Sequence, residues 1–187
     1  MKNIFLSLLV VLGLSACTET FDIKPEGAME SKTVPLENID LNRLMLNHHI
    51  HLKIATGEQP NLRLTADKNI LPYVLVHELE NTLDIRLAQS ANVSEAYEVQ
   101  ATLVLPKPLR YAQAYDYSSI EILSPFNADS LEVLLRKHAN LSAEVHSKFL
   151  KATLDDYSKI KLAGHLNDLS LDLQSGAKAD TTQLNIN

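Results

Sequence analysis

The chain has 187 residues and is 45% hydrophobic and 21% charged, a composition typical of one folded domain that excludes wholesale disorder and a protein with several membrane spans. Its single Cys excludes an internal disulfide and a zinc site built from several thiolates. The net charge of −6 argues against a nucleic-acid partner, because binding to nucleic acids rests mainly on Lys and Arg.

The first sixteen residues form a secretory signal pattern, in which a cation precedes an apolar run over residues 4–14. This run is too short to span a bilayer, which takes roughly 20 residues. The segment Leu14-Ser15-Ala16-Cys17 resembles the lipobox of bacterial lipoproteins, whose Cys becomes the acylated first residue of the mature protein. We therefore expect a signal peptide over residues 1–16 and attachment to membrane lipid through acyl chains such as palmitate on Cys17. Thr18 follows the Cys at a position where Asp would favour retention at the inner membrane. We therefore expect the protein at the outer membrane of the bacterial cell envelope.

Residues 17–33 are predicted to comprise the lipidated Cys and a flexible tether. They are polar, carry Pro25 and Gly27, and show neither a helical nor an alternating apolar period. The remaining residues, 34–187, are expected to form a single domain.

From residue 34 onward, apolar residues recur at every second position, which is the period of a strand with one buried face. The alternating positions are Ile50, Leu52, Ile54, Leu62, Leu64, Ala66, Leu83, Ile85, Leu87, Val99, Ala101, Leu103 and Leu105. Turn-forming residues separate these runs, and helix is indicated only locally, around residues 69–75 and 94–97. We therefore predict an all-β domain that begins with several strands.

The C-terminal half repeats with a period of about twenty residues. Each unit is a strand, a two-residue corner and a second strand. The corners are Asp116-Tyr117, Lys137-His138, Asp156-Tyr157 and Ser175-Gly176, and the small residues that follow them are Ser118, Ala139, Ser158 and Ala177. A repeated small residue at a bend suits a coil wound on itself, and a twenty-residue unit allows neighbouring strands to run parallel. The repeats therefore predict about four C-terminal coils of a parallel β-solenoid.

Three parts of the sequence together resemble the GIN domain family of bacterial adhesin head domains. They are the passage from Ile39 to Leu87, residues 101–122 and the C-terminal repeats. The resemblance covers nearly all of the chain from about residue 34, and it implies a right-handed β-solenoid preceded by strands. Members of this family usually have a Ser-Gly-Ala-like corner in successive coils, and here only 175–177 matches. The other three coils have Tyr117, His138 and Tyr157 at the position of this glycine. These larger residues argue against a left-handed corner conformation there.

Outward-facing aromatic residues near the corners are the first candidate site. Tyr117, His138 and Tyr157 occupy equivalent corner positions, and Tyr115 also points outward. Aromatic faces on a flat wall can stack on sugar rings, and the same residues can instead serve to cover the corners. Carbohydrate or protein at the cell envelope is the expected partner of such a surface.

The sequence gives less support to a catalytic site or a metal site than to this aromatic surface. Asp116 and Asp156 are equivalent corner residues, but Lys137 lies between them, which favours a ladder of alternating charge over a catalytic carboxylate pair. His49 and His51 share the solvated face of a predicted strand and are weak candidates for a metal site. The sequence lacks a Gly-rich phosphate loop, a Gly-x-Ser-x-Gly elbow and a Cys/His dyad, so we expect no cofactor and no nucleophilic catalysis.

These observations predict a lipid-anchored envelope module with a non-enzymatic binding, adhesion or scaffolding role. Two alternatives remain open. The first is a carbohydrate-binding or polysaccharide-processing β-helix protein, because such enzymes are built on the same kind of fold. The second is a periplasmic metal-binding protein that uses the histidines.

Overall fold

The computed structural model describes residues 20–93, 96–123 and 125–187, so the predicted signal peptide and Cys17 lie outside the described part of the chain. Within that part the chain forms fifteen strands and one 3-10 turn, which confirms the all-β prediction. The N-terminal strands are β1 (Phe21–Ile23), β2 (Met29–Pro35), β3 (Arg43–Leu46), β4 (Ile50–Thr56), β5 (Asn61–Asp67), β6 (Val74–Leu79), β7 (Thr82–Leu87), β8 (Ala91–Val93) and β9 (Val99–Leu105). The C-terminal strands are β10 (Tyr111–Ala114), β11 (Ser119–Ile122), β12 (Phe126–Leu135), β13 (Asn140–Leu154), β14 (Lys159–Leu173) and β15 (Lys178–Ile186).

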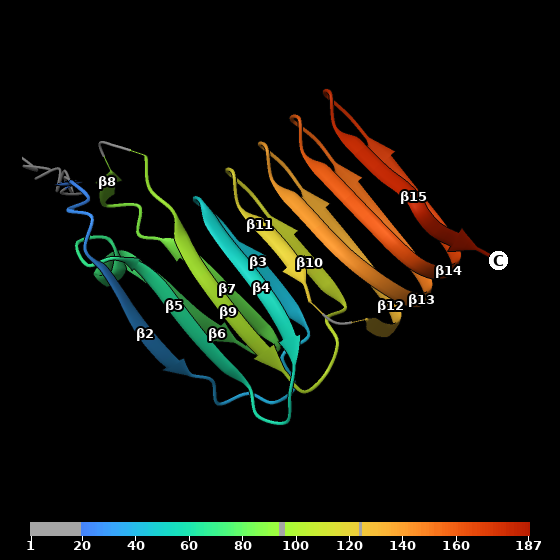
Figure 1. Cartoon of the computed structure of the whole chain (residues 1–187), viewed down its shortest axis with the longest axis horizontal. Helices are drawn as coiled ribbons and strands as arrows, with labels where there is room; N and C mark the ends of the chain where they lie inside the picture. Colours follow the sequence, from blue (N-terminus) through green and yellow to red (C-terminus); the bar gives the residue numbers. More distant parts are fainter. Residues whose placement is uncertain (1–19, 94–95, 124) are drawn as a thin grey trace, which may run out of the picture.

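Thirteen of the strands belong to one sheet, and β1 and β8 pair separately. In the C-terminal half every pair of neighbouring strands is parallel. The register repeats along the stack, so that Ala112 lies beside Val133, Val133 beside Ala152, and Ala152 beside Leu171. The sequence alignment of the repeats is therefore confirmed. Figure 1 shows these strands side by side along the long axis, with β15 at the C-terminal end.

Strands β3 and β4 extend the same two ladders toward the N-terminus. β3 pairs in parallel with β10 and β7, and β4 pairs in parallel with β11 and β9. Antiparallel pairing is confined to the N-terminal part, where β5 joins β9 to β2 and β6 joins β7. The predicted order, with strands that precede the repeats, matches this arrangement.

The predicted tether over residues 17–33 is wrong where it covers β1 and β2. Strand β2 pairs with β5 along all seven of its residues, and β1 pairs with β8. Side chains of β2 are almost all exposed, so this edge strand carries no apolar alternation that sequence analysis could detect. Backbone hydrogen bonds hold it instead. The carboxylate of Asp67 also accepts hydrogen bonds from the backbone amides of Glu26 and Gly27, at 2.8 and 2.7 Å.

The core consists mainly of inward-facing aliphatic residues of the strands. Ser118, Ala139 and Ser158 are fully buried in register beneath the corners, while Ala177 in the last unit is half-buried. The predicted column of small residues is therefore present. Ile50 takes the equivalent place beside Ser118, where its backbone amide donates to the Ser118 hydroxyl at 3.3 Å.

Helix is almost absent from the described residues. The helix indicated around residues 69–75 is a 3-10 turn, η1 (Leu71–Tyr73), and the one indicated at 94–97 lies partly outside the described residues, with Ala96 and Tyr97 in no regular element. The described helical structure is too short and not apolar enough to cross a lipid bilayer.

Candidate functional site

The corners of the repeats adopt a left-handed backbone conformation, which corrects the sequence prediction for the three corners without glycine. Both residues of each corner have positive φ, for example 47° at Asp116 and 60° at Tyr117. A hydrogen bond from the amide of Ser118 to the carbonyl of Tyr115, at 3.1 Å, closes the turn. This is the pattern of a type I′ turn, which Asp, Asn and Gly adopt most readily.

Neighbouring corners stabilise this strained conformation through backbone hydrogen bonds. The amide of Tyr117 donates to the carbonyl of Lys137 at 2.9 Å, and the amide of His138 donates to the carbonyl of Asp156 at 2.8 Å. A non-glycine residue with positive φ costs on the order of 1 kcal/mol or more unless its surroundings hold it. The stacking of the corners therefore replaces the glycine that the resemblance led us to expect.

Four rings stack on one another along the corners, and we call them the aromatic ladder: His49, Tyr117, His138 and Tyr157. Successive ring centroids lie 5.1, 4.7 and 5.5 Å apart, with planes within 9° of parallel. The predicted column of Tyr117, His138 and Tyr157 thus exists. Tyr115 is not part of it, since its half-buried side chain lines a separate hollow beside Asp116.

Both ends of the aromatic ladder are also covered. Tyr97 tilts against His49 with centroids 5.2 Å apart. At the other end, a Cβ built on Gly176 would lie 2.8 Å from the ring of Tyr157, so the ring lies over the glycine backbone. The ring faces are therefore occupied by neighbours, although Tyr117 and Tyr157 remain 51% and 62% exposed. A sugar can reach ring edges here, whereas stacking on the ring faces would require a neighbouring group to be displaced.

The aromatic ladder is expected to contribute to stability. Replacing His138 by Asn removes two ring contacts while keeping a residue that tolerates positive φ, so the free energy of unfolding should fall by about 1 to 2 kcal/mol. Urea unfolding followed by circular dichroism measures this. His77→Asn is the control, because His77 is exposed on β6 and makes no ring contact with any described residue. Equal stability of the two variants would contradict a structural role for the ladder.

The structure places His49 and His51 in different surroundings. His49 is a corner residue with φ of 55°, and its ring is stacked in the ladder. His51 faces outward on β4, where its Nδ1 lies 2.8 Å from the hydroxyl of Ser119 and its Nε2 lies 3.8 Å from a carboxylate oxygen of Glu98. Burial lowers the pKa of the neighbouring His48. No group of three potential metal ligands is formed within residues 20–93, 96–123 and 125–187.

The corner carboxylates take part in charge pairing. Lys137 Nζ lies 3.2 Å from a carboxylate oxygen of Asp116, and Lys137 belongs to the unit between Asp116 and Asp156. A hollow of about 440 Å³ beside these corners is lined by both acidic and basic side chains, including Arg136 and Asp155. The corners thus carry alternating charge, as the sequence predicts, and they do not form an isolated carboxylate pair.

Two other hollows were not predicted from the sequence. One, of about 580 Å³, is lined by His146 and His165, whose rings stack with centroids 5.3 Å apart, and by Arg110. The other, of about 650 Å³, lies along the outward face of β11, β13, β14 and β15, and we call it the lysine groove. Its lining side chains with ionisable or hydrogen-bonding groups are Ser119, Glu121, Asn140, Ser142, Lys159, Lys161, Lys178 and Asp180. The twenty-residue period already aligns Asn140, Lys159 and Lys178, so this groove was detectable from the repeat.

The described residues define an all-β protein of stacked parallel strands whose outward polar faces carry open grooves. The chain belongs to the family described as "Putative auto-transporter adhesin, head GIN domain", whose model matches residues 40–187. The resemblance found in the sequence is therefore confirmed. No curated protein is significantly similar to this chain.

Solved structures share the fold at low sequence identity. A "putative adhesin" from Parabacteroides merdae is 17% identical with a TM-score of 0.67, over 87% of this chain and 76% of that one. A "putative lipid binding protein" from Parabacteroides distasonis is 13% identical with a TM-score of 0.69, over 88% and 78%. A "putative adhesin" from Bacteroides fragilis is 13% identical with a TM-score of 0.53, over 88% and 100%.

Proposed function

We propose that this chain is a lipid-anchored binding module of the bacterial cell envelope, built as a right-handed β-solenoid and without enzymatic activity. The observation that carries the binding role is the lysine groove, an open hollow of about 650 Å³ on the outward face of β11, β13, β14 and β15. Repeating ladders of outward side chains suit adhesion or scaffolding, because they present a periodic surface to an extended partner.

The solenoid proposal rests on the parallel pairing and its register. Each unit contributes one strand to each of two ladders, and the same offset recurs in both, as in Ile120 beside Leu141 and Leu141 beside Ile160. A type I′-like corner joins the two strands within each unit. The right hand of the coil is the one that the family resemblance implies, and it agrees with the strong preference for right-handed parallel crossovers.

The non-enzymatic role is supported by the charge pairing at the corners and by the names of the structural relatives, which describe adhesion or lipid binding. The carbohydrate-processing alternative is tested by incubating the purified chain with a panel of polysaccharides and measuring new reducing ends. We expect none above the level of a heat-inactivated sample. Release of reducing ends in proportion to the amount of protein would favour the enzyme.

Anchoring at the outer membrane is proposed from the lipobox-like segment that ends at Cys17. Cys17→Ser should abolish incorporation of an alkyne-tagged palmitate and move the protein from the membrane pellet to the soluble fraction, because acyl chains at about 0.8 kcal/mol per buried methylene hold the wild-type protein in the bilayer. Ser15→Thr serves as the control for an altered signal region that keeps the thiol. Palmitate labelling or membrane retention of Cys17→Ser would contradict lipidation at this residue.

A further inference from the structure

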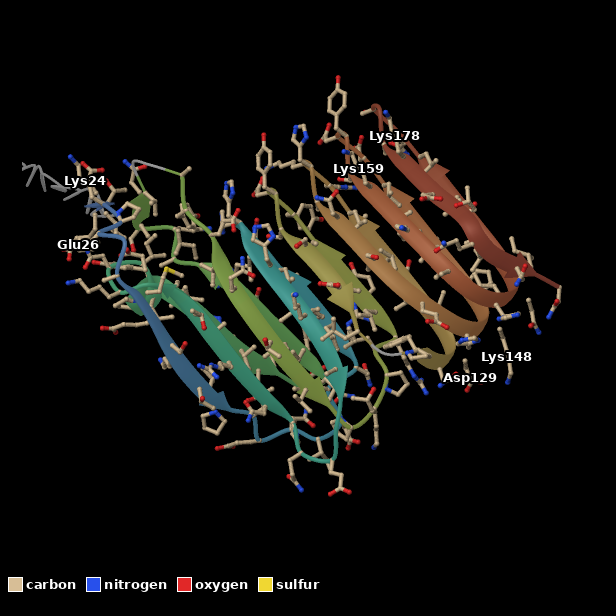
Figure 2. All side chains as sticks on the ribbon, in the orientation of Figure 1. Lys24, Glu26, Asp129, Lys148, Lys159 and Lys178 are labelled. Carbon is tan, nitrogen blue, oxygen red and sulfur yellow. The ribbon has the colours of Figure 1, made fainter. Side chains whose placement is uncertain are left out.

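Three lysines gather at the C-terminal part of the lysine groove. Lys159 and Lys178 are register partners on β14 and β15, and Lys161 lies two residues further along β14. Neighbouring strands lie about 4.8 Å apart, and two residues along a strand span about 6.6 Å, so the three ammonium groups cover one small area. Figure 2 shows Lys159 and Lys178 on adjacent strands near the corner end of the sheet.

Among the described residues, Lys159 and Lys178 lack the close acidic partners that other outward lysines have, and Lys161 lies opposite Asp180 without a close ion pair. Lys53 lies 3.5 Å from a carboxylate oxygen of Glu121, and Lys151 lies 3.3 Å from one of Glu132. By contrast, Lys159, Lys161 and Lys178 form no ion pair with any residue in the described part of the chain. Like charges directly opposite each other, as at Lys159 and Lys178, destabilise a ladder, and the whole chain has a net charge of −6. An anionic ligand would relieve this repulsion.

Hydrogen-bonding groups surround the lysines. The side-chain amide nitrogen of Asn140 donates to the backbone carbonyl of His138 at 3.1 Å. The side-chain oxygen of Asn140 remains as an acceptor in the groove. The hydroxyl of Ser142 also lines the groove. Thr182 donates to Asp180 from both its hydroxyl and its amide, and these bonds, together with the charge of Lys161, lower the pKa of Asp180. The groove therefore combines cations with neutral and anionic acceptors.

From this combination we infer that the lysine groove binds an acidic polysaccharide, with carboxylates of the sugar chain on Lys159, Lys161 and Lys178. The inference rests on the proposed binding function and names its ligand class. Sugar hydroxyls donate to Asn140 and Asp180, whereas the phosphates of a lipid surface offer few donors to these acceptors. A carboxylated sugar chain supplies both the anions and the donors that this groove requires.

The test is affinity electrophoresis of the full chain in detergent through gels that contain polygalacturonate, with neutral dextran of matched length as the comparison. We expect polygalacturonate alone to retard the protein, and the retardation to decline as salt rises from about 50 to about 500 mM. The double variant Lys159→Gln, Lys178→Gln should weaken the apparent affinity about tenfold.

The matched control is Lys24→Gln, Lys148→Gln, which changes the net charge equally. Lys24 is exposed near the N-terminus, and Lys148 lies 2.9 Å from Asp129 at the opposite end of the strands from Lys159 (Figure 2). An equal loss in both double variants, no loss in either, or no retardation by polygalacturonate would overturn the inference. Binding of dextran regardless of the lysines would also overturn it while sustaining the proposed binding function. Equally lysine-dependent binding to vesicles of phosphatidylglycerol would assign the groove to lipid phosphate instead. Circular dichroism melting of each variant verifies the fold.

Discussion

Replacing Gly164 by Ala is expected to lower the free energy of unfolding by about 3 to 5 kcal/mol, the largest effect of any substitution we predict. Gly164 lies within β14 with φ of 107°, a conformation that only glycine adopts readily. A Cβ at this position would lie 2.2 Å from the carbonyl oxygen of Val145 on β13. That contact is with backbone, so no side-chain rotation can relieve it.

The clash at position 164 would affect both neighbouring strands. Gly164 is the register partner of Val145 on one side and Leu184 on the other, and the pairing of β14 with β15 shifts between Lys161 and Ala163. A displaced backbone at Gly164 would therefore weaken both ladders beside this irregularity. We expect the melting temperature to fall by about 10 °C, measured by circular dichroism.

Gly27→Ala is the matched control for this prediction. Gly27 also has a positive φ, of 79°, but nothing lies within 4 Å of a Cβ built there. This variant should lose only about 1 kcal/mol, from conformational strain alone. If the two variants lose equal stability, the close approach to Val145 is not what requires glycine at position 164.

Ala139→Leu is expected to destabilise the protein by about 2 to 3 kcal/mol, because the larger side chain would be forced into the packed space beneath a corner. Ala139 is fully buried, as are Ser118 and Ser158, which hold the equivalent places in the units on either side. Three small residues in register allow the two ladders to approach at the bend. Urea unfolding measures the loss.

The same substitution at Ala177 provides the comparison. Ala177 occupies the equivalent place in the last described unit, where it is only half-buried and contacts one neighbouring unit among the described residues. Ala177→Leu should change the free energy of unfolding by less than about 1 kcal/mol. A large loss at Ala177, or a negligible one at Ala139, would show that crowding beneath the corners does not select small residues.

The strand alignment of the repeats could be predicted from sequence alone. Alternating apolar residues mark inward positions, and the period of about twenty residues aligns positions such as Leu135 and Leu154, which are register partners in the structure. The same period predicted the rings of Tyr117, His138 and Tyr157 in one column. These features depend on local periodicity, which is present in the sequence itself.

The fourth ring of the aromatic ladder and the first edge strand could not be predicted in this way. His49 stacks on Tyr117 because β4 lies beside β11. This pairing joins residues that are 68 positions apart in the chain, as for Ile50 and Ser118, so it cannot be found from a local period. Strands β5 to β9 interrupt the period between them. Strand β2 was missed because its side chains are exposed, and its pairing to β5 leaves no apolar pattern.

The sequence by itself therefore determined the all-β class, the register of the repeated strands, the position of the corners and the family. The tertiary structure alone decided the backbone of those corners and the availability of the rings. Left-handed residues such as Tyr117 and His138 are stable there because hydrogen bonds and ring contacts from adjacent units hold them. Those same ring contacts cover the aromatic faces, so the proposed binding surface is the lysine groove instead. Such contacts join residues distant in the chain, and they exist only after the units have stacked.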